Sequence, residues 1–298
     1  MPQNSRRADA SYRQKISTVL AYIREHLHEP LHLEELACVA CLSPFHFHRI
    51  FSAFTGESLH QHVKRLRLEQ AAARLLYSRE PVGKIATENG YISPAAFSKA
   101  FTQHFGVTPS AYKTQRAAVP ERAAKSSWGV SQTPDSRALE CRYERRAPQR
   151  VLYVRRTGKY DVAAAQAWET LMRFTGERGL LNAAALRIGV TYDFPEITDE
   201  EHTRYEACLA CDTKVPMHED ISTQTLRGGE FAVFEHAGAY ETLWATYDAI
   251  YSRWLPAEHV VLANAPSYAV YLNDPYAVAP EQLRTQICIP VQSVKRYS

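Results

Sequence analysis

The stretch that decides the fold of the first part of the chain is SPFHFHRIF, residues 43–51. It returns fifty residues later as SPAAFSKAF, residues 93–101, and Gly56 returns in the same way as Gly106. In each copy the serine can cap free N–H groups at a helix start, and proline at the first helical position already has the helical φ angle. The repeat therefore predicts two short helices that each begin at a Ser-Pro pair.

The first of these helices is predicted to have two faces of different character. Its apolar residues recur at i, i+3, i+4 and i+7 and predict a core face: Phe47, Ile50, Phe51 and Phe54. A second stripe has the same spacing: Phe45, His48, Arg49 and Ser52. A short helix gains no stability by directing His48 and Arg49 to one side, whereas a protein that reads DNA bases needs such a face. His46 is expected to pack between helices.

The second copy repeats the arrangement with fewer large outward side chains. Its core stripe is Phe97, Phe101 and Phe105, and its outward stripe is Ala95, Ser98, Lys99 and Thr102. The helix expected between the copies, at about 59–77, would span roughly 26–29 Å at 1.5 Å per residue. Successive major grooves on one face of a duplex lie about 34 Å apart, so one rigid helix can present both short helices to neighbouring grooves.

The remaining periodicity up to residue 116 is also helical. Apolar spacing, Ser-Pro starts and a stop at Pro30 predict an all-α block with these helices: 11–28, 33–41, 44–54, 59–77, 82–89, 94–104 and 109–116.

Residues 11–116 resemble the AraC/XylS DNA-binding domain, which has two helix-turn-helix units. The resemblance rests on LEELACVACLSPFHFHRIFSAFTGESLHQHVKRLRLEQAAARLL and on VGKIATENGYISPAAFSKAFTQHFGVTPSAYK. One departure is His62, where the second copy has the more usual aromatic residue, Tyr112. The resemblance implies DNA contacts in adjacent major grooves from the following residues: Phe45, His48, Arg49, Ser52, Pro94, Ala95, Ser98 and Lys99. Because alanine offers only apolar contact, we expect the second unit to read bases weakly and to grip mostly phosphate.

The character of the chain changes after this block. Residues 117–138 lack a sustained period and contain Pro, Ser and Gly, which is typical of a linker. Beyond it the pattern predicts an α+β domain. Its expected strands are 150–156, 187–193, 204–210, 231–236, 268–272 and 284–291, with helices near 161–178 and 240–254.

A second repeat, with an offset of eighty residues, runs through this later part. It pairs Gly158 with Gly238, Tyr160 with Tyr240, Arg204 with Arg284 and Cys208 with Cys288. A duplicated strand-helix-strand-strand unit of this kind predicts two halves related by a pseudo-twofold axis, with a ligand cleft along their seam.

The seam is expected to bind a small molecule through aromatic side chains and one carboxylate: Trp168, Tyr192, Tyr205, Glu206, Tyr240, Trp244, Tyr268 and Tyr271. Glu206 lies in the middle of a predicted strand. Among aromatic rings it would suit a flat cation. Alternatively, it faces solvent on the open side of the sheet.

Residues 140–293 resemble the GyrI-like effector-binding domain through RYEACLA, EHAGAYETLWATYDAIY and SYAVYLNDPYAVAPEQLRTQICIPV. The resemblance implies sensing of lipophilic or cationic small molecules, including multidrug sensing, and some family members bind DNA gyrase or hydrolyse reactive cyclopropane compounds. This chain has Ala269 where the family usually has glutamate and Gln286 where an acidic residue is typical. Both departures weaken cation binding and acid/base hydrolysis in the second repeat.

The charge and cysteine content fit this division. Residues 1–118 hold 15 Lys/Arg and 9 Asp/Glu, whereas residues 119–298 hold 20 and 23, so a polyanion partner is expected for the first part only. Two C-x-x-C pairs, Cys38/Cys41 and Cys208/Cys211, are expected to be small buried thiols in a reducing cytoplasm, with no metal or other cofactor. No signal peptide or membrane span is expected.

These observations predict a multidomain protein, with an all-α double helix-turn-helix domain at 8–116, a linker at 117–138 and an α+β effector domain at 139–298. The predicted function is a cytoplasmic, non-enzymatic transcription regulator that binds double-stranded DNA and a small effector, with RNA polymerase as a candidate partner. Two alternatives remain open: a hydrolase of reactive electrophiles fused to a DNA-binding head, and a docking module for gyrase or polymerase.

Overall fold

The computed structural model describes residues 2–114, 139–181, 185–193, 197–212, 215, 218, 220–258, 260–263 and 265–292. The linker predicted at 117–138 lies outside them. The described residues fall into two compact units, one made mainly of the helices up to residue 114 and one made mainly of the part from residue 139 on. In these ranges no helix combines the length and the apolar character needed to cross a membrane.

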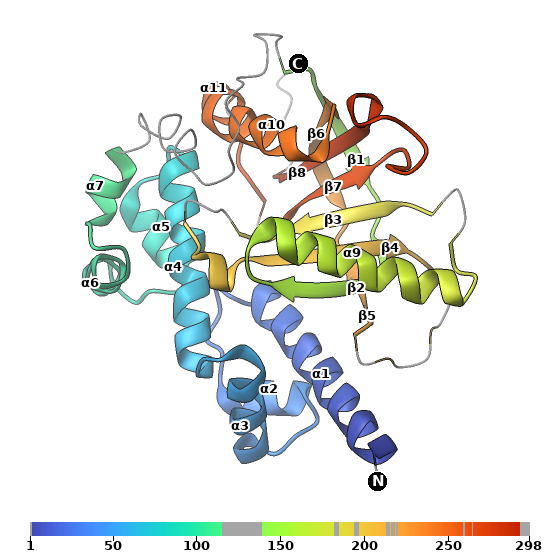
Figure 1. The fold of residues 1–298 in the computed structure, drawn as a ribbon. Coiled ribbons are helices and arrows are strands. Elements are labelled where there is room, and N and C mark those ends of the chain that lie inside the picture. Colours follow the sequence, from blue (N-terminus) through green and yellow to red (C-terminus); the bar gives the residue numbers. More distant parts are fainter. Residues whose placement is uncertain are drawn as a thin grey trace. The chain divides into compact units, whose positions relative to one another are not determined.

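The helical unit is all-α, as predicted. Its helices are α1 (Pro2–Glu25), α2 (Leu33–Val39), α3 (Pro44–Thr55), α4 (Leu59–Tyr77), α5 (Val82–Glu88), α6 (Pro94–Phe105) and α7 (Pro109–Thr114) (Figure 1). The side chains of Ser43 and Ser93 accept hydrogen bonds from backbone N–H groups three residues on, at 3.4 and 3.1 Å. Gly56 and Gly106 end the two helices with φ of 75° and 74°. The predicted Ser-Pro starts are therefore confirmed, and the two repeated glycines are found to end the helices.

The core of the helical unit is built from the apolar stripes. Phe47, Phe51, Phe97 and Phe101 are all 0% exposed. Helix α4 packs against helices of both halves, namely α3, α5, α6 and α7. One packing prediction is wrong: His46 is exposed, because it lies one residue before Phe47 on the outer side of α3.

The second unit is built on one eight-stranded sheet with the strand order β1-β6-β8-β7-β3-β4-β2-β5. Its strands are β1 (Cys141–Arg146), β2 (Gln149–Thr157), β3 (Arg187–Thr191), β4 (Arg204–Ala210), β5 (Ser222–Leu226), β6 (Gly229–Ala237), β7 (Ser267–Tyr271) and β8 (Arg284–Val291). Helix α9 (Tyr160–Glu177) belongs to the first half. A continuous helical stretch, η3 (Tyr240–Thr242), α10 (Leu243–Ala249), η4 (Ile250–Trp254) and α11 (Leu255–Ala257), belongs to the second. Short 3₁₀ turns, η2 (Glu200–His202) and η5 (Pro280–Gln282), precede β4 and β8.

The eighty-residue repeat is confirmed by the element bounds. β2 and β6 are related by this offset at both ends, as are β3 and β7, and the helical stretch 240–257 repeats α9. Backbone contacts repeat as well: Gly158 N–H donates to Thr203 O at 2.9 Å, and Gly238 N–H donates to Leu283 O at 3.0 Å. The α+β fold with pseudo-twofold symmetry is therefore correct.

The two halves exchange their first strands. β1 pairs with β6 of the second half, and β5 of the second half neighbours β2 of the first. Neither β1 nor β5 was predicted from the sequence. They are edge strands with the polar sequences CRYERR and STQTL, and polar edge strands carry a weak apolar pattern.

The pseudo-twofold axis passes between β3 and β7 at the centre of the sheet. Gly189 and Ala269 are related by the eighty-residue offset and are also direct partners in the antiparallel register. This pairing is possible only where the axis crosses the strands. Residues on β3 and β7 near this pair thus belong to the predicted seam.

Candidate functional site

The outward face of α3 is open to solvent. Phe45 is 68% exposed, His48 and Arg49 are also exposed, and Ser52 is partly buried. The Arg49 guanidinium lies 5.8 Å from the centre of the Phe45 ring. Among the described residues, none is found in an ion pair with Arg49. Its donors are therefore available to an acceptor outside the protein.

The outward face of α6 is smaller and less polar. Pro94, Ala95 and Lys99 are exposed, and Ser98 is partly buried. Ile92, just before the helix, is 104% exposed. Lys99 supplies one cation to this face, and the remaining groups offer mainly apolar contact. The outer face of α3 is thus polar and cationic, whereas that of α6 is mainly apolar with one cation.

Helix α4 sets the distance between these two faces. It contains 19 residues, which corresponds to about 28 Å at 1.5 Å per residue. Its first turn is fixed by a capping box in which Ser58 and Gln61 satisfy each other's backbone N–H groups.

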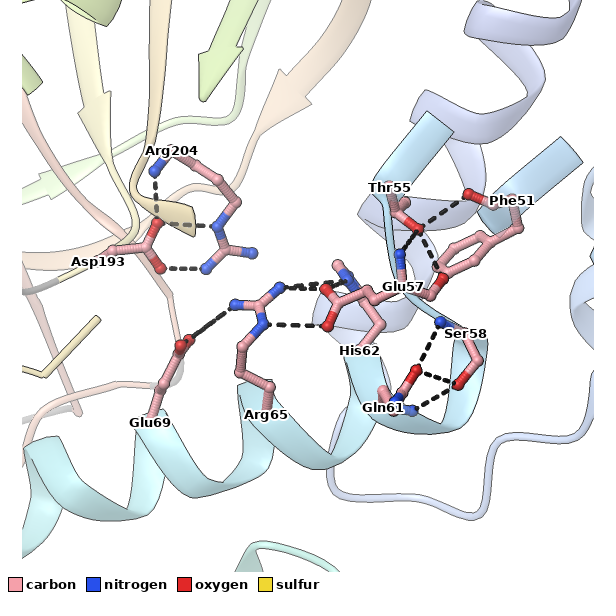
Figure 2. A network of polar contacts seen from close by, with 10 residues as sticks. All are labelled: Phe51, Thr55, Glu57, Ser58, Gln61, His62, Arg65, Glu69, Asp193 and Arg204. Carbon is pink, nitrogen blue, oxygen red and sulfur yellow. Dashed lines mark hydrogen bonds and ion pairs between the residues drawn. The ribbon is translucent and has the colours of Figure 1, made fainter. Parts of the chain in front are cut away.

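A buried polar network holds α3 to the start of α4 (Figure 2). Arg65 donates from Nη2 to Glu57 at 2.5 Å and from Nη1 to both carboxylate oxygens of Glu69 at 3.2 Å. The Nδ1 of His62 lies 2.7 Å from Glu57. Burial by itself would raise the pKa of Glu57, but the hydrogen bonds from His62 and Arg65 prevail and lower it to about 2.

His62 takes the place of the usual aromatic residue in this network. Its ring meets Phe51 edge-on at 5.4 Å and 85°, and the ring of Tyr112 meets Phe101 at 5.3 Å and 77°. The substitution therefore preserves the local packing. The two partners of His62 were not predicted from the sequence: Glu57 lies in the turn before α4, and Arg65 lies one helical turn further along α4.

The cysteines depart in part from expectation. Cys208 is buried, but Cys38 and Cys41 are both exposed. The prediction of small buried thiols is wrong for this first pair, because α2 turns its apolar face, Leu36 and Ala37, inward and leaves Cys38 outside. Among the described residues no three His, Cys, Asp or Glu gather in a metal-binding group.

The residues predicted to bind a ligand divide between the two faces of the sheet. Successive residues in a strand point to opposite faces, so Tyr205 and Glu206 cannot share one. The face covered by the helices contains Trp168, Tyr205, Tyr240, Trp244 and Tyr271. The opposite face contains Glu206, Tyr192 and Tyr268.

On the helix-covered face a tyrosine pair lies at the pseudo-twofold axis. The hydroxyls of Tyr205 and Tyr271 are 3.0 Å apart, and Trp168 Nε1 donates to Tyr205 at 2.8 Å. A Cβ on Gly189 would lie 2.3 Å from the Tyr205 hydroxyl and 2.7 Å from that of Tyr271. Only glycine at 189 leaves room for the tyrosine pair, a role that was not predicted from the sequence.

On the opposite face Glu206 is fully buried and already paired. It accepts hydrogen bonds from Arg155 Nε at 2.7 Å, from the Tyr192 hydroxyl at 2.6 Å and from Gln224 Nε2 at 2.6 Å. Its side chain is 0% exposed, which rules out the alternative that it faces solvent. A cationic effector was expected to pair with Glu206, but the Arg155 guanidinium of the chain itself already does so.

The second half has a neutral counterpart of this arrangement. Gln286 accepts a hydrogen bond from Arg146 Nη2 at 2.9 Å, and Arg146 also pairs with Glu144 at 2.8 Å. The Arg146 guanidinium lies 6.0 Å from the centre of the Tyr268 ring. A neutral glutamine can occupy position 286 because Glu144 already balances the positive charge of Arg146.

The ends of the central strands are tied symmetrically. Asp193 Oδ2 accepts from the backbone N–H of Arg204 at 2.7 Å (Figure 2), and Asn273 Oδ1 accepts from that of Arg284 at 3.0 Å. The Arg204 guanidinium adds two further hydrogen bonds to Asp193. These contacts fix the turn before β4 and the turn before β8.

Two family models match the chain. A GyrI-like small molecule binding domain matches residues 139–292, and a helix-turn-helix domain matches residues 36–115. The first match covers more than half of the chain.

Curated relatives match the helical part. The chain is 33% identical over 103 residues to the regulatory protein SoxS of Salmonella typhimurium, and this match covers 35% of the chain and 96% of SoxS. It is 41% identical over 93 residues to the MmsAB operon regulatory protein of Pseudomonas aeruginosa, a match that covers 31% of the chain and only 30% of that protein.

Among solved structures, the DNA-binding domain of AdpA in complex with a target DNA is 34% identical. The match covers 36% of the chain and 98% of the AdpA domain, with a TM-score of 0.35. At this TM-score the structural likeness adds nothing to the family matches.

Proposed function

Because the chain belongs to the GyrI-like family and joins that domain to an AraC-type helix-turn-helix domain, we propose that it is a one-component transcription regulator. In this proposal residues 8–116 bind duplex DNA, residues 139–298 bind a small effector, residues 117–138 link them, and the protein works in the cytoplasm. The observation that carries the proposal is the pair of capped helices, α3 and α6, with open outer faces on one helical frame.

The two helices have different roles in DNA binding. Phe45, His48, Arg49 and Ser52 contact base edges, and Arg49 is suited to bidentate hydrogen bonding with guanine. Pro94, Ala95, Ser98 and Lys99 position the second unit, with Lys99 on a phosphate. Since α4 is about as long as the spacing of successive grooves requires, a single chain can occupy both without a dimer.

The effector site is the helix-covered face of the sheet near the pseudo-twofold axis. Trp168, Tyr240, Trp244 and Tyr271 are partly buried and offer their rings to a flat, lipophilic ligand, while the buried Tyr205 positions Tyr271 and Trp168 through its hydroxyl. Glu206, Tyr192 and Tyr268, on the other face, form an internally balanced cluster. The Arg155–Glu206 pair therefore favours an uncharged aromatic effector over a cation.

Binding without turnover is the role proposed for this domain. Ala269 occupies the position at which the family usually has glutamate, and it is 2% exposed beside Gly189. Without a carboxylate there, acid/base hydrolysis in the second half lacks its proton carrier.

Selection of bound sequences from a random duplex library by the full chain tests the DNA half. We expect a recovered motif with two parts about one helical turn apart, the part bound by α3 being the more specific. The effector half is tested by adding uncharged aromatic compounds to the protein–DNA complex. If a compound changes the affinity of the protein for DNA by some factor, DNA must change the affinity of the protein for that compound by the same factor, because coupling between two sites is reciprocal.

The outcomes separate this proposal from its rivals. Turnover of an electrophilic cyclopropane compound would favour the hydrolase. Capture of gyrase or RNA polymerase, with no compound altering DNA affinity, would favour a docking module. A library that yields no enriched sequence would contradict sequence-specific binding altogether.

A further inference from the structure

Two exposed thiols lie in the turn of the first helix-turn-helix unit. Cys38 is near the end of α2, Cys41 follows that helix, and α3 begins at Pro44. Neither cysteine belongs to the proposed DNA contacts or to the proposed effector site.

Cys41 has a backbone conformation that favours glycine. Its φ is 50°, and among the described residues it is the one non-glycine residue with positive φ. The second unit has Gly90 at the same point, with φ 76°, and the hydrogen bonds agree: Cys41 N–H donates to Cys38 O, and Gly90 N–H donates to Thr87 O. A residue held in an unfavourable backbone region often serves a function that compensates for the strain.

The turn brings the two cysteines within range of a disulfide. The hydrogen bond from Cys41 N–H to Cys38 O is 2.9 Å long and joins residues three apart. Such a turn holds its first and last Cα atoms less than about 7 Å apart, and a disulfide needs about 4.4–6.8 Å. Both side chains are exposed, so an oxidant can reach them.

We propose that Cys38 and Cys41 form a redox site that a hydroperoxide closes into a disulfide, which weakens DNA reading by α3. One thiolate attacks the peroxide, the O–O bond breaks, and a sulfenic acid forms while alcohol or water leaves. The second thiolate attacks that sulfur, the S–S bond forms, and hydroxide leaves as water after taking a proton. Two thiols and one hydroperoxide thus give one disulfide, one water and one alcohol, or two waters when the oxidant is hydrogen peroxide.

The effect on DNA follows from the short distance along the chain and rests on the proposed function. Leu42 packs against the helical core, and Ser43 caps α3. A change in the turn at Cys41 is therefore passed directly to the start of the helix that carries Arg49. Loss of one good base contact weakens binding about 5- to 150-fold.

The sequence supplies an internal control. Cys208 and Cys211 have the same spacing, but Cys208 lies buried in β4, and the N–H of Cys211 continues the pairing with Arg150 O at 3.2 Å. An extended chain separates residues three apart by about 10 Å, too far for a disulfide. Trypsin releases the first pair in the peptide 25–49 and the second in the peptide 205–214.

The experiment treats the full chain with stoichiometric hydrogen peroxide and measures peptide masses and DNA affinity. We expect the peptide 25–49 to lose two hydrogens, reversibly with a dithiol reductant, while the peptide 205–214 keeps both thiols. DNA affinity should fall about 5- to 150-fold in the wild type and stay constant in Cys38→Ser and Cys41→Gly.

A peptide 25–49 that stays reduced overturns the proposal, and so does a disulfide that leaves DNA affinity unchanged. A reduced wild type that fails to bind DNA overturns the proposed function and the regulatory role together. The peptide masses then still decide whether the pair is a redox site.

Discussion

Arg155 and Glu206 are direct partners in the register of β2 and β4, and the Arg155 Nε donates to the carboxylate at 2.7 Å. The two side chains are 13% and 0% exposed. The charge of the most deeply buried glutamate in the effector domain is thus balanced from within. In the proposed function, recognition of an effector then depends chiefly on the aromatic residues of the other face.

Arg155→Met should strongly destabilise the effector domain. Removing one partner of a buried ion pair leaves the other charge without compensation, which costs about 3–5 kcal/mol. Denaturant unfolding followed by tryptophan fluorescence measures this, because all four tryptophans lie after residue 117. Arg173→Met on the exposed side of α9 is the control and should behave like the wild type. Equal stability of both variants would show that Glu206 does not depend on Arg155.

The helical unit should lose stability in acid through Glu57. The pKa of Glu57 is lowered to about 2, so the ionised form contributes stability that is complete above the ordinary pKa of about 4.5 and disappears as the pH falls towards 2. The contribution is about 3 kcal/mol at neutral pH. Glu57→Gln should therefore be less stable than the wild type at pH 7 and similar to it near pH 2, as measured by circular dichroism during urea unfolding. A constant difference across this range would exclude the ion pair as the cause.

Gly189→Ala should disrupt the tyrosine pair at the pseudo-twofold axis. The new Cβ would lie 2.3 Å from the Tyr205 hydroxyl and must displace it, and overpacking of this kind costs about 1–3 kcal/mol. Gly176→Ala in α9 is a matched control, because its Cβ would meet only Leu181 Cδ1 at 3.6 Å. The control should gain up to about 1 kcal/mol, since alanine favours a helix. Thermal unfolding and effector binding should both separate the two variants.

Arg49→Ala and Lys99→Ala should affect DNA binding in different ways. Loss of a guanine contact by Arg49 should relax specificity at one or two base pairs, each worth about 1–3 kcal/mol. Loss of a phosphate contact by Lys99 should weaken binding to all sequences and reduce the salt-dependence slope by about 1. Affinity for matched and scrambled duplexes at several salt concentrations distinguishes them. A uniform loss in Arg49→Ala would show that this residue does not read bases.

Cys41→Gly should stabilise the reduced helical unit. Glycine adopts the φ of 50° without steric cost and should add roughly 0.5–1 kcal/mol. The control is Cys38→Ser, which changes an exposed thiol without altering the turn and should leave the unfolding temperature nearly unchanged. A lower unfolding temperature for Cys41→Gly would mean that the thiol itself contributes to the folded state.

Much of the fold could be read from the sequence where the signal is local. Ser43, Pro44 and Gly56 fix α3 within a few residues of each end, and α4 has the bounds predicted for it, 59–77. β4 and β8 have the bounds predicted for them from their β-branched and aromatic runs, 204–210 and 284–291. The edge strands β1 and β5 were missed, because a strand with one neighbour and few apolar residues leaves little pattern.

Sequence alone determined the two repeats, the caps, the open faces of α3 and α6 and the number of halves in the second domain, because these depend on residues a few positions apart. It could also have separated Tyr205 from Glu206, since neighbours in a strand face opposite ways. Only the tertiary structure decided that β1 and β5 change halves, that Gly189 makes room for Tyr205 and Tyr271, and that Arg155 neutralises Glu206. The β2–β4 and β1–β6 pairings join residues about fifty to ninety positions apart, and their register is set by the packing of the whole sheet rather than by any one segment.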